Sequence, residues 1–443
     1  MPTENLIAEL KSKEKIEAYW DFRKNDERKH VHSMIKYPAV MVPNMQGEIF
    51  DLILKNDNDI HNVLDPFMGS GTILVEGLIR GLDVIGIDIN PLSYLSVLVK
   101  TQRYVRNTLN EKVSTLIKRV SDTPPESAED YSFDGITKWY KPDVISSLSW
   151  IRTCILAEPE VKYRRFFWLA FAEIAKQADN ARTSTFKLHI KLEETIEETE
   201  YDCLTNFCEK LRSNVVAIQS FAKLKQSTSN KLFLGDSTKL LKDKRRFCEN
   251  SVDLVITSPP YGDNATTITY GQYSVLPLRW IPLADIHQDI SNATIANLTR
   301  IDSDSLGGRS YSIEAIEKSG ILEISKELKT FYDMLLESNE KEKARKVASF
   351  IIDFSDVIKN LAALVKPGKL LVFTVGNRHV HKAEFPLHLV LKEVASYYGL
   401  DMLYDFRRNI IKNKNYIDTT VQGFKTINKE SILILQKRIA TET

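Results

Sequence analysis

The sequence of 443 residues lacks the signs of several classes of protein. Its four cysteines stand outside CxxC spacing, so the sequence predicts neither a zinc site nor a disulfide framework. No apolar run approaches the roughly 20 residues that a membrane-spanning helix needs. The charged N-terminal stretch also holds no apolar segment of the signal-peptide kind. We therefore expect a cytoplasmic protein without a membrane segment or a bound metal.

The sequence also lacks an excess of either charge. Its 60 Lys and Arg residues and 59 Asp and Glu residues give a formal net charge of +1, which does not by itself favour a polyanionic partner. A nucleic-acid surface would have to be a local patch. The hydrophobic share of 43% and the charged share of 27% are ordinary for a protein with a large core.

Patterns of strands and helices alternate over much of the chain. A strand at 63–64, a glycine-rich turn, a helix and a second strand ending near residue 88 form a compact βαβ unit. Further strand patterns occur at 231–237, 252–257, 366–377 and 430–437, with helical periodicity between them. The sequence therefore predicts an α/β fold with a doubly wound, mostly parallel sheet.

The remaining segments suggest a division of the chain. We expect an N-terminal part at 1–100 that contains the βαβ unit, and within it a solvated helical arm at 4–30. We expect a mainly helical insertion at 101–230, and a second half of the core at 231–443. A polar, irregular stretch at about 265–320 is expected to form a smaller insertion.

The turn at 65–72, with the sequence DPFMGSGT, lies between the first strand and its helix. Gly69 and Gly71 would allow a tight turn and close approach of a ligand to the backbone. The pattern is not GxGxxG, because position 74 is Leu, and no Gly-Lys-Ser/Thr of a P-loop follows. The next strand ends at Asp88, where a carboxylate can accept hydrogen bonds from ribose hydroxyls. The alternative is a structural βαβ turn with a helix-capping Asp.

A second motif, TSPPY at 257–261, follows a strand of apolar residues. Proline lacks a backbone donor and has a fixed φ, so Pro259 and Pro260 must end the strand and stiffen the loop. Rigid loops at the ends of strands are where α/β folds place their chemistry.

These motifs together resemble those of a known family. DPFMGSGT, GIDINP, LFLGDS and VDLVITSPPYGD are similar, in this order, to the motifs of S-adenosylmethionine-dependent DNA amino-methyltransferases. The stretch at 32–54 resembles the motif that covers the methionine end of the cofactor, and LVKPGKLLVFTVGN resembles a later core strand. The resemblance spans roughly 30–100, 230–265 and 350–436.

The resemblance implies a Rossmann-like methyltransferase fold and S-adenosylmethionine as cofactor. Asp88 is then expected at the ribose, Asp236 at the adenine amino group, and Tyr37 and Pro38 at the methionine moiety. The full set of cofactor-binding candidates is Tyr37, Pro38, Asp65, Phe67, Gly69, Gly71, Thr72, Asp88, Asn90 and Asp236.

The resemblance also implies a catalytic role for the four residues after Thr257. An exocyclic amine is a poor nucleophile, and two acceptors on its hydrogens would direct the nitrogen lone pair at the methyl group. The Ser258 side chain and the Pro259 carbonyl are the implied acceptors. Pro260 would stiffen the loop, and Tyr261 would offer a ring face to a base flipped out of double-stranded DNA.

The target base is predicted less directly. Serine at the first motif position is commoner in cytosine-N4 enzymes, and Asp or Asn is commoner in adenine-N6 enzymes, so we expect cytosine N4. Methylation at cytosine C5 typically uses a cysteine after a proline, which this sequence lacks. The alternatives are an adenine-N6 enzyme, an RNA guanine-N2 methyltransferase, and a non-enzymatic cofactor- or DNA-binding subunit.

Two regions are candidates for contacting DNA. Within 131–230, Arg182, Lys187 and Lys191 are candidate phosphate contacts, whereas the aromatic residues of this region are expected to be core. The segment 265–320 follows the catalytic loop and is the other candidate. The expected setting is a restriction-modification or defence system with a separately encoded endonuclease.

Overall fold

The computed structural model describes most of the chain. It covers residues 2–22, 28–38, 40–122, 129–183, 187–225, 228–262, 269–381, 383–410 and 429–439.

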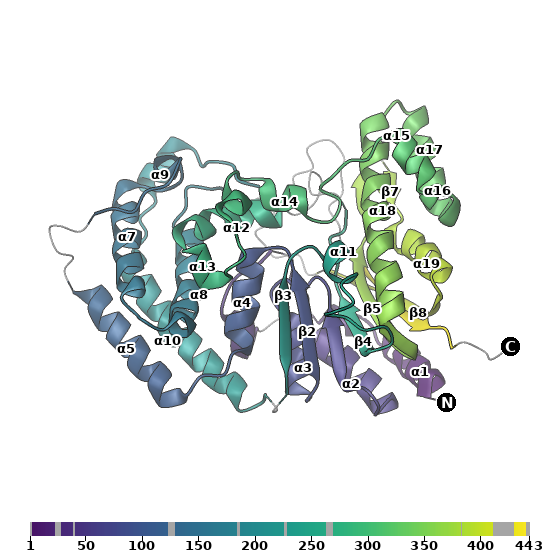
Figure 1. The fold of residues 1–443 in the computed structure, drawn as a ribbon, viewed down its shortest axis with the longest axis horizontal. Helices are drawn as coiled ribbons and strands as arrows, with labels where there is room; N and C mark the ends of the chain where they lie inside the picture. Colours follow the sequence, from purple (N-terminus) through teal and green to yellow (C-terminus); the bar gives the residue numbers. More distant parts are fainter. Residues whose placement is uncertain are drawn as a thin grey trace.

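A seven-stranded sheet forms the centre of the molecule, in the order β3-β2-β1-β4-β5-β9-β8 (Figure 1). Its strands are β1 (Asn62–Asp65), β2 (Asp83–Asp88), β3 (Asn230–Leu234), β4 (Val252–Thr257), β5 (Val365–Gly376), β8 (Leu400–Asn409) and β9 (Lys429–Lys437). The first five pair in parallel, whereas β9 is antiparallel to both β5 and β8. The predicted doubly wound, mostly parallel α/β fold is confirmed. A separate small sheet pairs β6 (Arg378–Val380) with β7 (Ala383–Phe385).

Helices cover both faces of the sheet, and successive strand residues point to opposite faces. Leu254 and Ile256 of β4 join the core shared with one set of helices, whereas Val255 between them joins the core on the other face. The first set comprises α1 (Pro2–Glu14), η1 (Tyr19–Asp21), η2 (His30–Ser33), α2 (Pro43–Asn56), α3 (Thr72–Ile79) and α4 (Pro91–Thr101). The other face is covered by α11 (Ser237–Leu240), α15 (Ile313–Lys318), α16 (Ile321–Ile324), α17 (Lys326–Glu337), α18 (Lys341–Leu364) and α19 (Leu387–Tyr397).

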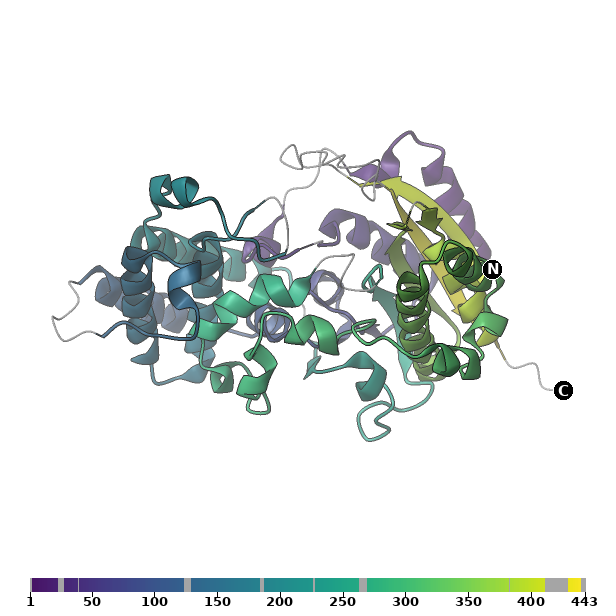
Figure 2. The ribbon, with the colours of Figure 1, turned by 90° about the horizontal axis from the view of Figure 1, so that it is seen from above.

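The chain between α4 and β3 forms a helical layer at one end of the molecule (Figures 1 and 2). Its helices are α5 (Arg106–Ser121), α6 (Ile136–Trp139), α7 (Pro142–Leu156), α8 (Val161–Gln177), α9 (Glu193–Glu198) and α10 (Cys203–Ala222). The aromatic side chains of α8, including Phe166 and Trp168, are fully buried. The expectation that they are core residues is confirmed.

The expected solvated arm at 4–30 was wrong. Helix α1 ends at Glu14, and its apolar residues Leu6 and Leu10 are buried. Trp20 packs against Phe406 of β8, with ring centroids 4.5 Å apart and ring planes tilted by 35°. The charged residues of this segment lie on its outer face. A stripe of apolar residues on the opposite face packs against α2 and β8.

The stretch after the TSPPY loop was also wrongly expected to be irregular. From residue 269 on it forms α12 (Tyr270–Trp280), α13 (Leu283–Ile286), η3 (Asn292–Ile295) and α14 (Arg300–Asp304). Pro277 lies inside α12, where a proline usually argues against a helix. Burial of Leu276, Leu278 and Trp280 stabilises the helix despite this proline.

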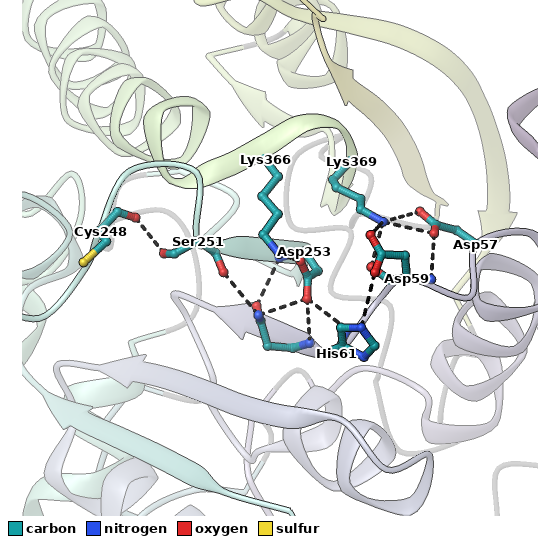
Figure 3. Close-up of polar contacts among 9 residues, drawn as sticks. Asp57, Asp59, His61, Cys248, Ser251, Asp253, Lys366 and Lys369 are labelled. Carbon is teal, nitrogen blue, oxygen red and sulfur yellow. Dashed lines mark hydrogen bonds and ion pairs between the residues drawn. The ribbon is translucent and has the colours of Figure 1, made fainter.

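A cluster of charged residues ties three strands together at their amino-terminal ends (Figure 3). The Asp253 carboxylate is completely buried and accepts hydrogen bonds from the backbone N–H groups of His61 and Asn62, at 2.9 and 3.1 Å. Its other oxygen lies 2.5 Å from Lys366 Nζ, at the start of β5. One carboxylate on β4 therefore links β1 and β5, at the edge opposite the pocket described below.

Asp253→Ala is expected to lower the free energy of unfolding by about 3 kcal/mol, because it leaves the N–H groups of His61 and Asn62 and the Lys366 ammonium without their acceptor. Urea unfolding measures this. Asp356→Ala, which removes a half-exposed ion pair with Lys242, is the matched control and should change stability little. Equal losses in the two variants would contradict the special role of Asp253.

Candidate functional site

A pocket of about 890 Å³, including its open mouth, lies at the carboxyl ends of the parallel strands. This is the edge where doubly wound folds bind ligands. Of the predicted cofactor-binding residues, those that line the pocket are Tyr37, Phe67, Gly69, Thr72, Asp88, Asn90 and Asp236. Ser258 and Pro260 line the same pocket, so the structure brings the glycine turn and the TSPPY loop together.

Asp88 holds the glycine turn in place at the end of β2. Its carboxylate accepts from the backbone N–H groups of Gly69 and Asn90, both at 2.8 Å. Burial raises the pKa of Asp88, and the backbone donors oppose this effect. Each carboxylate oxygen has more than one acceptor site, so Asp88 can also accept from a ligand in the pocket.

The two glycines of the turn have different roles. Gly69 lines the pocket with φ +47°, a left-handed conformation that favours glycine. Gly71 also has a left-handed φ, +81°, but it does not line the pocket: a Cβ there would lie 2.8 Å from Val97 Cγ2 of α4. Gly71 therefore permits close packing of α3 against α4.

Two further candidates lie behind the pocket rather than in its wall. Asp65 is fully buried and accepts from Phe67 N–H at 3.0 Å and from the Thr257 hydroxyl at 2.7 Å. Burial raises its pKa to about 7. Pro38 is buried beside Tyr37 and does not belong to the described residues that line the pocket. The structure gives both residues a supporting position.

Tyr37 and Asn90 form the pocket wall together with a residue that sequence reasoning missed. The Asn90 amide donates to the Tyr37 hydroxyl at 3.1 Å and to Ser274 Oγ at 2.8 Å. Its side-chain oxygen caps α4 by accepting from Leu92 N–H. Tyr270 of α12 stacks on Tyr37 with ring centroids 5.8 Å apart. Asn90 thus fixes a pair of aromatic rings at the pocket wall.

Asp236 and Phe67 complete the predicted set. Asp236 follows β3 and caps the short helix α11, accepting from the Thr238 N–H at 2.9 Å and from its hydroxyl at 2.7 Å. Phe67 lines the pocket and packs edge-to-face against Phe354 of α18. Asp302 was missed: its carboxylate accepts from the N–H groups of Gly271 and Gln272 at the start of α12 and also lines the pocket.

The TSPPY loop leaves the end of β4 with Pro259 buried and its neighbours half-buried. Ser258 Oγ lies 3.2 Å from the Tyr261 hydroxyl, and that hydroxyl donates to Glu430 Oε1 at 2.8 Å. Arg408 in turn donates from Nε to Glu430 Oε2 at 2.7 Å, and its Nη2 lies 2.6 Å from the same oxygen. Burial and the Glu430 charge raise the pKa of Tyr261. Glu430 and Arg408, on β9 and β8, were not predicted.

The candidate phosphate contacts lie in a loop after α8. Arg182 is exposed and donates from Nε to the Ile190 carbonyl, and Lys191 donates to the Asp179 carbonyl at 2.8 Å. Lys187 is exposed beside Leu188, whose N–H donates to Gln272 of α12. This loop therefore adjoins the helix that carries Tyr270. Residues 265–268 of the 265–320 candidate lie outside the described residues.

Within the described residues, no group of three or more His, Cys, Asp or Glu side chains is arranged to hold a metal ion. Across the same part of the chain, every helix is too short or too polar to cross a bilayer.

Comparison with known proteins identifies the family. The model of the N6/N4 DNA methylase family matches residues 3–98. A Type II methyltransferase of Kocuria varians, M.MvaI, is 31% identical over 438 residues, which are 95% of this chain and 94% of the relative. M.MjaII of Methanocaldococcus jannaschii is 31% identical over 113 residues, 25% of this chain and 21% of that one.

Among solved structures, the rRNA methyltransferase AviRa of Streptomyces viridochromogenes is 10% identical and covers 90% of this chain and 86% of its own. The TM-score of 0.29 is too low to support a common fold. The match to M.MvaI, in contrast, extends over nearly the whole of both chains. The chain therefore belongs to the N6/N4 family of DNA methylases, and S-adenosylmethionine is the cofactor of that family.

Proposed function

We propose that the protein transfers a methyl group from S-adenosylmethionine to the N4 amine of cytosine in duplex DNA. The observation that carries this proposal is the position of Ser258 and Pro260 in the pocket that Asp88 and Gly69 also line. A cofactor bound over the glycine turn would have its reactive end beside the TSPPY loop. No other described part of the chain combines these features.

The residues present fit the cofactor. The Asp88 carboxylate is the candidate partner of the ribose hydroxyls, and Asp236 is the candidate partner of the adenine amine, because both line the pocket at neighbouring strand ends. Gly69 leaves the floor of the pocket free of a side chain. Tyr37 is the candidate contact of the methionine moiety. The cofactor supplies the electrophilic methyl group.

The TSPPY loop supplies the activation of the amine. Ser258 Oγ and the Pro259 carbonyl are acceptors for its two hydrogens, which favours a lone pair directed at the methyl group. The stiffness of consecutive prolines keeps these acceptors in place before the reaction. The Tyr261 ring is the stacking surface for the flipped base.

Serine at position 258 supports cytosine N4 rather than adenine N6, and the relative named as a Type II methyltransferase supports a role beside a cognate restriction endonuclease. Mass spectrometry of nucleosides from DNA of an expressing host tests this assignment. Detection of N6-methyladenine would agree with the proposed mechanism but would contradict cytosine as the target base. Detection of methylated tRNA together with unmodified DNA would contradict DNA as the substrate.

Asp88→Ala should weaken binding of S-adenosylmethionine by about 1.5–3 kcal/mol, because it removes a charged acceptor from the pocket. Isothermal titration calorimetry measures this. Asp83→Ala changes an exposed carboxylate at the other end of the same strand and should leave the affinity unchanged. Unchanged affinity in Asp88→Ala would remove this residue from the site.

Neutral replacement of Arg182, Lys187 and Lys191 together should weaken binding to duplex DNA. If all three contact phosphates, the slope of log K against log salt should flatten by about 0.9 per contact. Cofactor affinity should stay the same. Replacement of Lys55, Lys244 and Arg245, which lie in segments leading into β1 and β4, is the control. If affinity and slope both survive the first set, the loop after α8 does not bind DNA.

Ser258→Ala and Tyr261→Ala should impair different steps of the reaction. Ser258→Ala removes an acceptor needed mainly in the transition state, so the single-turnover rate should fall about tenfold to a hundredfold with DNA and cofactor affinity nearly intact. Tyr261→Ala should also lose about 1–3 kcal/mol of stacking on the flipped base. Fluorescence of 2-aminopurine at the target position reports flipping. A wild-type rate in Ser258→Ala would show that TSPPY is not the catalytic loop.

A further inference from the structure

Four side chains form a continuous line of hydrogen bonds that leads away from the proposed catalytic serine. The line runs from Ser258 to Tyr261 on the same loop, then to Glu430 of β9 and Arg408 of β8. Tyr261 and Glu430 are 169 residues apart in the chain. The side chains of Glu430 and Arg408 are only 14% and 4% exposed, so water competes little for their bonds.

The direction of each bond follows from the number of protons available. The Glu430 carboxylate can only accept, and it takes two donor atoms of Arg408 at Oε2 and the Tyr261 hydroxyl at Oε1. Tyr261 has a single hydroxyl proton, and it uses this proton in its hydrogen bond to Glu430 Oε1. In the 3.2 Å contact between Tyr261 and Ser258, the serine must therefore be the donor.

This direction matters for the reaction proposed above. A serine hydroxyl that donates to Tyr261 keeps its lone pairs free and can accept from the amine of the target base. A serine that accepts from Tyr261 would have one of these lone pairs occupied. We propose that Glu430, held by Arg408, is a positioning residue that keeps Ser258 an acceptor by setting the direction of the bond through Tyr261. This inference rests on the proposed function of Ser258.

The isosteric change Glu430→Gln tests the direction rather than the presence of the side chain. Arg408 donates from two nitrogens, so the amide oxygen of Gln would face Arg408 and the amide NH₂ would face Tyr261. That NH₂ would donate to the Tyr261 oxygen, and the tyrosine proton would turn to Ser258. We expect the single-turnover rate to fall about tenfold, with cofactor and DNA affinity within about twofold of wild type.

A double-mutant cycle separates this role from a structural one. Tyr261→Phe retains the ring but removes the hydroxyl through which Glu430 acts. In the Tyr261→Phe background, Glu430→Gln should therefore cause no further loss of rate, whereas independent effects would multiply. Asp401→Asn is the control, because it alters another carboxylate–arginine pair, with Arg438, toward the other end of the same two strands. It should leave the rate unchanged.

The outcomes distinguish this inference from the function on which it rests. A slow Ser258→Ala with a wild-type rate in Glu430→Gln would overturn the role of Glu430 and keep the catalytic serine. Multiplying losses in the double variant would also overturn it, since Glu430 would then act by another route. A wild-type rate in Ser258→Ala would instead reject the proposed function itself. A slow Glu430→Gln with non-additive losses and normal thermal unfolding supports the inference.

Discussion

The buried carboxylate of Asp65 joins the two halves of the site. At the end of β1 it accepts from Phe67 N–H, which begins the glycine turn, and from the hydroxyl of Thr257, which ends the strand before Ser258. The two motifs lie far apart in the chain, and β1 and β4 are neighbours in the sheet. Together with the pairing of β1 and β4, one acceptor that lies outside the pocket wall therefore sets the relative position of the glycine turn and the TSPPY loop.

The parts of the site that could be predicted from the sequence are those at or just beyond the carboxyl end of a strand. Asp88 is the last residue of β2, and Gly69, Asp236 and Ser258 lie within four residues of the ends of β1, β3 and β4; parallel strands bring their carboxyl ends to one edge. Each of these residues is therefore placed by a local pattern. The fold class could be predicted for the same reason, because strand and helix patterns alternate along the chain.

The residues that were missed reach the site only through tertiary structure. Glu430 and Arg408 lie on strands that pair beside β5, and the polar sequence of β8 gave no strand pattern. Tyr270 lies on a helix whose internal proline argues against a helix. Gly71 shows the opposite difficulty: its sequence pattern is the same whether the missing Cβ makes room for a ligand or, as observed, for Val97.

The order of the strands has a consequence for folding. Strand β9 lies between β5 and β8, although it is the last of the three in the chain, so β8 cannot join the main sheet before β9 has paired on both sides. The pocket wall around Asp88 uses residues no later than 306. During synthesis, domains begin to form from the N-terminal side, and contacts between distant residues form slowly. A nascent chain can thus assemble most of this pocket before the strand that carries Glu430 has joined the sheet beside Tyr261.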